Sequence, residues 1–141
     1  MTELAKKRPE FRNINPLTDL PKYRLPAAGW VSILHRISGV LMFVLLPFIL
    51  WMFDKSVSSE ISYARFRYAF NGGAFGVLLK LVALALIWAY LHHFIAGVRH
   101  VWMDVSHKAV SQSFGTRSAK VTLWLSLLLT FLLALKLFGA W

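Results

Sequence analysis

The chain has 141 residues and a formal net charge of +10, with 57% hydrophobic and only 16% charged residues. This composition is too apolar for an ordinary soluble domain. The chain has no cysteine, which excludes disulfides, zinc–thiolate sites and iron–sulfur clusters held by its own side chains. No nucleic-acid-binding motif accompanies the positive charge, so we expect no nucleic-acid partner.

Three apolar runs are long enough to cross a membrane as helices, since a span of a ~30 Å hydrocarbon core needs about 20 residues. They cover approximately residues 29–53, 74–103 and 121–141. A soluble helical bundle would have to hide the run at residues 77–89, which only Lys80 interrupts. The sequence therefore predicts an all-α integral membrane protein, with three transmembrane helices within residues 29–141.

Basic side chains gather on one side of the predicted membrane. The segment before the first helix and the connection between the second and third helices are strongly basic, whereas the three basic residues of the other loop are offset by two acidic ones. By the positive-inside rule, the N-terminus and the second connection face the cytoplasm and the C-terminus faces outward. The basic residues on the cytoplasmic side are Lys6, Lys7, Arg8, Arg12, Lys22, Arg24, Arg36, Arg99, Lys108, Arg117 and Lys120.

Residues 1–28 are polar and contain four prolines. Proline fixes φ and lacks an N–H, so no long helix fits there. We expect an extended cytoplasmic arm that lies on the membrane face or against a partner. A disordered tail is the alternative.

The first predicted helix carries a polar cluster near its start. Ser32, His35 and Arg36 stand at positions i, i+3 and i+4 and therefore share one face. Arg36 alone can be explained by snorkelling to the headgroups, but the three side chains together favour a functional site. Pro47 is expected to kink this helix further along.

The second predicted helix ends in a polar stretch. His93, Gly97 and His100 lie within about 40° of one another on a helix, and Gly97 leaves a notch on that face. His92 is turned about 100° away, onto the face of Arg99. Ionisable groups at membrane depth are functional candidates, and imidazole is an axial ligand to haem iron. We interpret this stretch as part of a haem site.

The antiparallel course of the first two helices brings their polar clusters to the same depth, near the cytoplasmic side. Asp104 lies near the same boundary, where it can hold His100 or a neighbouring arginine. The outer loop at residues 54–73 offers no chemistry. The third helix offers no ligand, and we expect it to serve packing and anchoring.

Two motifs resemble those of a known family. The run Ser32-Ile33-Leu34-His35-Arg36-Ile37-Ser38-Gly39 and the run from His93 to His100, followed by Asp104, resemble the S-I-x-H-R-x-S-G and H-x-x-x-G-x-R-H-x-x-x-D signatures. These are signatures of the cytochrome b membrane-anchor subunit of succinate dehydrogenase, respiratory complex II. The likeness covers nearly the whole chain.

The resemblance implies roles for individual residues. His93 would be an axial ligand of one haem b, whose second axial ligand comes from a partner anchor subunit. Ser32 and Arg36 would line a ubiquinone pocket. His35, Arg36 and His100 would lie near the haem propionates, and Gly97, Arg99 and Asp104 would support the site.

The resemblance also implies an electron-transfer subunit that is not catalytic alone. Its expected partners are the second anchor subunit, an iron–sulfur subunit, a flavoprotein subunit and membrane lipid. Two other hypotheses stay open at this point. One is a haem-free structural anchor that docks a soluble enzyme, and the other is a proton-conducting protein that uses the His/Arg/Asp cluster.

Overall fold

The computed structural model describes residues 15, 17–19 and 22–139, and these residues form helices and no strand. The helices are α1 (Ala27–Val44), α2 (Leu46–Val57), α3 (Glu60–Asn71), α4 (Gly73–Val105), the short 3₁₀ helix η2 (His107–Val110) and α5 (Gln112–Leu137). Three of them, α1, α4 and α5, are long and apolar enough to cross a membrane. The predicted all-helical class is confirmed, with three candidate membrane spans. Most of the arm predicted for residues 1–28 lies outside the described residues.

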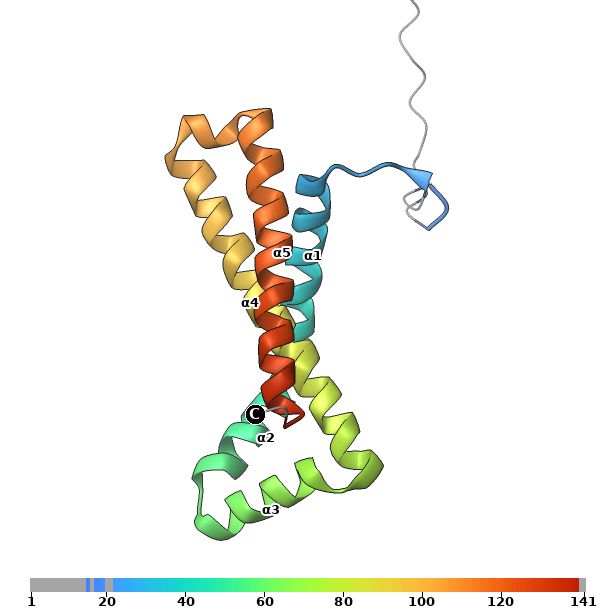
Figure 1. The fold of residues 1–141 in the computed structure, drawn as a ribbon, viewed down its shortest axis with the longest axis vertical. Coiled ribbons are helices and arrows are strands. Elements are labelled where there is room, and N and C mark those ends of the chain that lie inside the picture. The colour runs from blue at the N-terminus through green and yellow to red at the C-terminus, as the bar shows by residue number, and fades with distance from the viewer. Residues whose placement is uncertain (1–14, 16, 20–21, 140–141) are drawn as a thin grey trace, which may run out of the picture.

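Helices α1, α4 and α5 contact one another and form the bundle in Figure 1. The beginning of α1, the end of α4 and the α4–α5 connection lie at one end of this bundle. Helices α2 and α3 lie at the other end. The bundle therefore brings the two polar clusters of the sequence to the same end.

The prediction of one kinked helix over residues 29–53 is wrong. The helix ends at Val44, Leu45 forms a turn, and α2 begins at Leu46 with Pro47 in its first turn. Proline has no N–H to donate, and its ring clashes with the carbonyl four residues earlier. The same residue fits the first turn of a new helix, where its N–H would be unpaired anyway. Pro47 therefore separates two helices instead of bending one.

The predicted outer loop at residues 54–73 is largely helical. Ser59 and Ser62 form a capping box that starts α3: Ser62 N–H donates to Ser59 Oγ over 3.1 Å, and Ser59 N–H donates to Ser62 Oγ over 3.0 Å. This arrangement satisfies two backbone donors that a helix start leaves free. The Phe66 ring of α3 lies 6.3 Å from Trp51 of α2 and 4.7 Å from Phe70. An aromatic cluster thus holds α3 against α2.

Two further helix bounds differ from the prediction. Helix α4 has 33 residues, or about 50 Å at 1.5 Å per residue, which is longer than the ~30 Å of a hydrocarbon core. Helix α5 begins at Gln112, not at residue 121. These added turns include Gly115, and a single glycine costs an α-helix only about 1 kcal/mol. The polar sequence after Ser111 therefore continues the third span.

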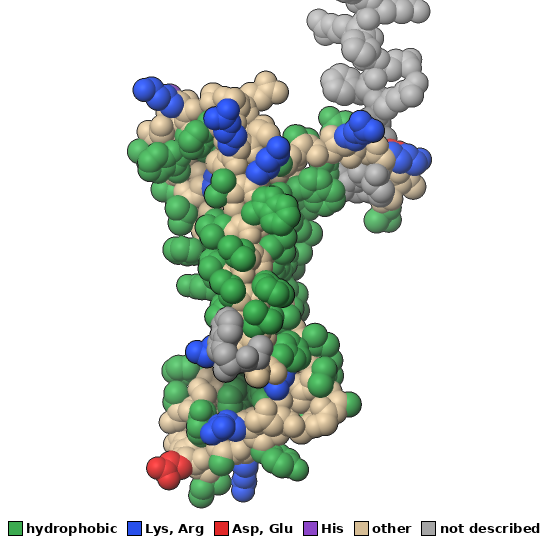
Figure 2. All heavy atoms as spheres, in the orientation of Figure 1, with side chains coloured by type: hydrophobic (Ala, Val, Ile, Leu, Met, Phe, Trp, Pro, Cys, Tyr) green, Lys and Arg blue, Asp and Glu red, His purple; other side chains and the backbone are tan. Residues whose placement is uncertain are grey.

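Small side chains form the contact between the three spans. Ala96 and Ala119 are fully buried with Val31, and Ser38 and Ser126 are equally buried. In lipid, helices associate through close packing and interhelical hydrogen bonds, which small residues permit. Large apolar side chains face outward instead. Figure 2 shows them covering the waist of the molecule, with most Lys and Arg side chains towards its two ends.

Gly76, near the start of α4, is required by a close backbone approach. An added Cβ would lie 2.7 Å from the carbonyl oxygen of Phe70, which cannot rotate away as a side chain could. We expect Gly76→Ala to destabilise the fold by roughly 1–3 kcal/mol, measured as a lower thermal unfolding midpoint in detergent. Gly115→Ala is the matched control, because its Cβ would have Arg99 Nη2 as nearest neighbour at 4.0 Å. Equal midpoints for the two variants would contradict this account of Gly76.

Candidate functional site

Three imidazole rings meet between α1 and α4. The ring of His35 on α1 stacks on that of His93 on α4, with centroids 4.1 Å apart and planes inclined by 17°. The ring of His100, two turns further along α4, lies 5.2 Å from His35 in a tilted arrangement. The structure thus brings together the histidines that the sequence placed on two separate helices.

The orientation of the His93 ring follows from its hydrogen bonds. Its Nδ1 lies 3.0 Å from the carbonyl oxygen of His35 and 3.3 Å from Ser38 Oγ. A backbone carbonyl only accepts, so Nδ1 carries the proton and donates it. The Ser38 hydroxyl donates to the same carbonyl over 2.8 Å. This arrangement leaves the lone pair of His93 on Nε2, as in histidines that bind a metal through Nε2.

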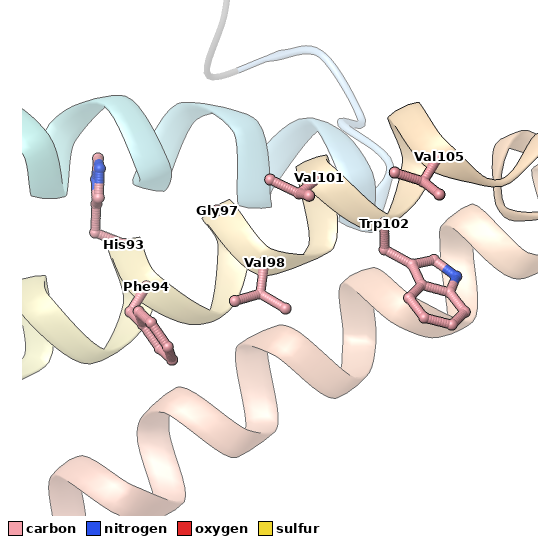
Figure 3. A pocket seen from close by; sticks show the side chains of 7 residues that line it. All are labelled: His93, Phe94, Gly97, Val98, Val101, Trp102 and Val105. Carbon is pink, nitrogen blue, oxygen red and sulfur yellow. The ribbon is translucent and has the colours of Figure 1, made fainter.

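An apolar groove of about 490 Å³ runs along α4 beside His93 (Figure 3). In Figure 3, His93 points towards α1, whereas Phe94 and Val98 point to the other side of α4. Gly97 lies in the middle of the groove, and a Cβ there would come within 3.7 Å of His35 Nε2. The groove is lined by His93, Phe94, Gly97, Val98, Val101, Trp102 and Val105.

Two glycines keep the imidazole cluster open. Besides Gly97 on α4, Gly39 on α1 faces His93, and its Cβ would lie 3.0 Å from His93 Cε1 and 3.4 Å from Nδ1. Sequence reasoning assigned no role to Ser38 or Gly39, although both belong to the first motif. Ser38 stands three residues after His35, and that spacing was the signal that could have revealed it.

His92 is kept away from this cluster. It is fully buried, its Nδ1 lies 3.1 Å from Ser126 Oγ on α5, and its ring stacks on Trp88 at 5.5 Å. Helical phase predicted this separation of the two adjacent histidines. His92 therefore joins α4 to α5, whereas His93 faces α1.

Arg99 also lies outside the imidazole cluster. Its Nε donates to Ser118 Oγ over 3.0 Å and its Nη2 donates to the Gly115 carbonyl over 3.2 Å, both on α5. The side chain is only 9% exposed. Arg99, which was expected to support the same site as His93, forms these hydrogen bonds with α5 because its helical position points it towards that helix.

The other predicted site residues lie near the cluster's end of the bundle. Ser32 is half-buried and Arg36 is exposed on the same stretch of α1, and Asp104 is exposed near the end of α4. None of these three side chains forms a hydrogen bond within the part of the chain that the structure describes. Asp104 therefore holds neither His100 nor an arginine there, and Ser32 and Arg36 are available to a ligand.

Comparison with known proteins places the chain in a family. Residues 10–133 match the family described as succinate dehydrogenase/fumarate reductase transmembrane subunit. The chain belongs to this family. Its three spans are therefore those of a transmembrane subunit, and its likeness to the cytochrome b anchors extends beyond the two motifs.

Several relatives in this family carry the name succinate dehydrogenase cytochrome b556 subunit. The protein of Rickettsia felis is 27% identical over 135 residues, covering 92% of this chain and 98% of the relative. That of Coxiella burnetii is 30% identical over 87 residues, covering 62% of this chain and 67% of the relative. That of Paracoccus denitrificans is 29% identical over 97 residues, covering 68% and 72% respectively.

Proposed function

We propose that this chain is a membrane-anchor subunit of a succinate:quinone oxidoreductase. It binds one haem b jointly with a second anchor subunit, and it forms part of the site where ubiquinone is reduced. The observation that carries this proposal is the fixed imidazole of His93, whose Nδ1 donates to the His35 carbonyl and whose Nε2 remains free beside an apolar groove. The cytochrome b556 name of the relatives supports it.

The residues around His93 fit a haem. His93 Nε2 would hold the haem iron, and Gly97 leaves room for the edge of a flat ring system. His35 Nε2 is buried without a hydrogen-bond partner among the described residues, which suits the vicinity of a propionate. When bound, haem b supplies a one-electron carrier.

The quinone side of the site consists of Ser32 and Arg36. Both stand on one face of α1, at the end of the bundle where His93 and His100 lie. The Ser32 hydroxyl donates to a quinone oxygen. The Arg36 guanidinium stabilises negative charge that develops on that oxygen during reduction, an effect that is stronger in a low-dielectric site. The side chains position the quinone and do not carry the electrons.

The partners and topology follow from this assignment. An iron–sulfur subunit and a flavoprotein subunit bring electrons from succinate to the cytoplasmic end of α1 and α4. Lys108, Arg117 and Lys120 are exposed at this end, in agreement with the positive-inside rule. The chain then spans a bacterial-type inner membrane, with its N-terminus on the cytoplasmic side and its C-terminus on the outer side.

The reduced-minus-oxidised absorption spectrum of the purified complex tests the proposed function. We expect a b-type band, with about one haem for each copy of this chain. A complex that reduces quinone without any such band would leave this chain as the haem-free structural anchor.

The contact between Gly39 and His93 provides a finer test of the haem geometry. We expect Gly39→Ala to shift the b-type absorption band and lower haem occupancy, because the added Cβ would lie 3.0 Å from His93 Cε1 and displace the ring from its bond to the His35 carbonyl. Gly29→Ala is the control, because the nearest neighbour of its Cβ would be Leu25 Cδ2, the end of a side chain that can rotate away, at 3.3 Å. An unchanged spectrum in Gly39→Ala would refute the assigned ring position.

A further inference from the structure

A second groove, of about 540 Å³, lies between α4 and the first turns of α5. Val98 and Trp102 line both this groove and the one beside His93, so the two grooves are neighbours on α4. Unlike the His93 groove, this one contains two guanidinium groups, those of Arg99 and Arg117. The proposed quinone and haem chemistry uses neither of them.

Arg99 is a buried cation that pairs with no carboxylate among the residues that the structure describes. Its two hydrogen-bond acceptors, Ser118 Oγ and the Gly115 carbonyl, are neutral, and the one ion pair in the described residues joins Lys55 to Asp54. A guanidinium has five N–H donors, so three remain available. A buried charge is costly unless it is paired. Because Arg99 lines the groove, an anion that enters the groove can reach these donors.

The depth of the groove matches the headgroup region. Arg99 lies six residues before the end of α4 and Arg117 five residues after the start of α5, which places them about 9 Å and 7.5 Å from those ends at 1.5 Å per residue. Towards the membrane interior, the walls of the groove are apolar, with Ile95 on α4 and Val121 on α5. The two guanidinium groups thus lie at the headgroup end of the groove, and apolar side chains line the groove towards the membrane interior.

We propose that this groove binds one anionic phospholipid. The phosphodiester lies between Arg99 and Arg117, and an acyl chain follows Ile95, Val98 and Val121 towards the membrane centre. Basic pockets between transmembrane helices on the cytoplasmic side recognise phospholipid headgroups in this way. A free phosphate would leave the apolar walls in contact with water, and a neutral quinone would leave the two guanidinium groups without a counter-charge.

The proposal is tested on the purified complex in detergent, by native mass spectrometry during titration with phosphatidylglycerol or with phosphatidylcholine of the same acyl chains. We expect phosphatidylglycerol to bind this chain preferentially. We expect Arg117→Gln to weaken that binding roughly tenfold, the factor that a direct hydrogen bond to a charged group contributes. Arg99→Gln should weaken it further, and Arg117→Gln, on an exposed side chain, carries the test if Arg99→Gln does not assemble.

Lys120→Gln is the matched control, because Lys120 is an exposed cation on α5 that does not line the groove. Equal weakening by Lys120→Gln and Arg117→Gln would overturn the proposal in favour of unspecific surface attraction. If millimolar inorganic phosphate displaces phosphatidylglycerol, the groove is a site for a simple anion, and the proposal of a lipid site is overturned. The absence of any preference over phosphatidylcholine would mean that another subunit covers the groove or that it is empty, and the proposal would fail.

Discussion

His93→Leu is expected to abolish the b-type band in the reduced-minus-oxidised spectrum of the complex. His93 is the histidine whose ring nitrogen Nδ1 donates to a backbone carbonyl and leaves Nε2 for iron. Leucine occupies a similar volume but offers no lone pair, so the iron loses one axial ligand while the helix keeps its packing. We expect a loss of most of the haem, measured by the spectrum and by extracted haem per complex.

His92→Leu is the matched control for this experiment. The two histidines are adjacent, but His92 is fully buried against Ser126 and Trp88 on the side of α5. Its replacement removes one interhelical hydrogen bond, worth about 1 kcal/mol, and should leave the band in place. Retention of the band in His93→Leu together with its loss in His92→Leu would reverse the assignment.

Arg36→Ala is expected to depress succinate-driven ubiquinone reduction by a factor of about 10²–10³, the usual effect of removing one group that stabilises developing charge. Electron transfer from succinate to a soluble acceptor should change little, because that path ends before the membrane subunit. The two activities are measured on the same purified complex. A selective loss of quinone reduction supports the role of Arg36 in the quinone site.

Two comparisons separate this role from simpler ones. Arg24→Ala, at an exposed basic position before α1, should affect neither activity. Arg36→Lys keeps a long cation that can snorkel to the headgroups but lacks the planar donor fork of arginine. Full activity in Arg36→Lys would mean that Arg36 only snorkels to the headgroups and has no specific role in the quinone site. Equal loss of both activities in Arg36→Ala would indicate failed assembly.

Helical phase and charge distribution predicted much of the candidate site. A residue turns by about 100° from its neighbour on a helix, so His92 and His93 had to face different partners, and they do. The positive-inside rule oriented the first two predicted helices antiparallel with their polar clusters at one end, which is where His35 and His93 meet. Both arguments use only the regular geometry of long apolar helices.

The remaining features depend on contacts that periodicity does not encode. The helix in the outer loop depends on a Ser59–Ser62 capping box, and a serine pair is a weak signal in a polar sequence. The hydrogen bonds of Arg99 depend on Gly115 and Ser118, which were expected in a loop and lie instead in the first turns of α5. Helical phase already placed Arg99 and His93 on different faces of the helix. The hydrogen-bond partners of Arg99 could be identified only from the structure.

The most direct test of the central claim is the haem content of this chain expressed with and without its neighbouring membrane-anchor subunit. If this chain supplies one axial histidine and the partner the other, haem with two histidine ligands should be found in the pair and not in this chain alone. Low-temperature electron paramagnetic resonance of the oxidised sample reports that ligation. A stoichiometric bis-histidine haem in the chain alone, or a pair that assembles without haem, would contradict the account.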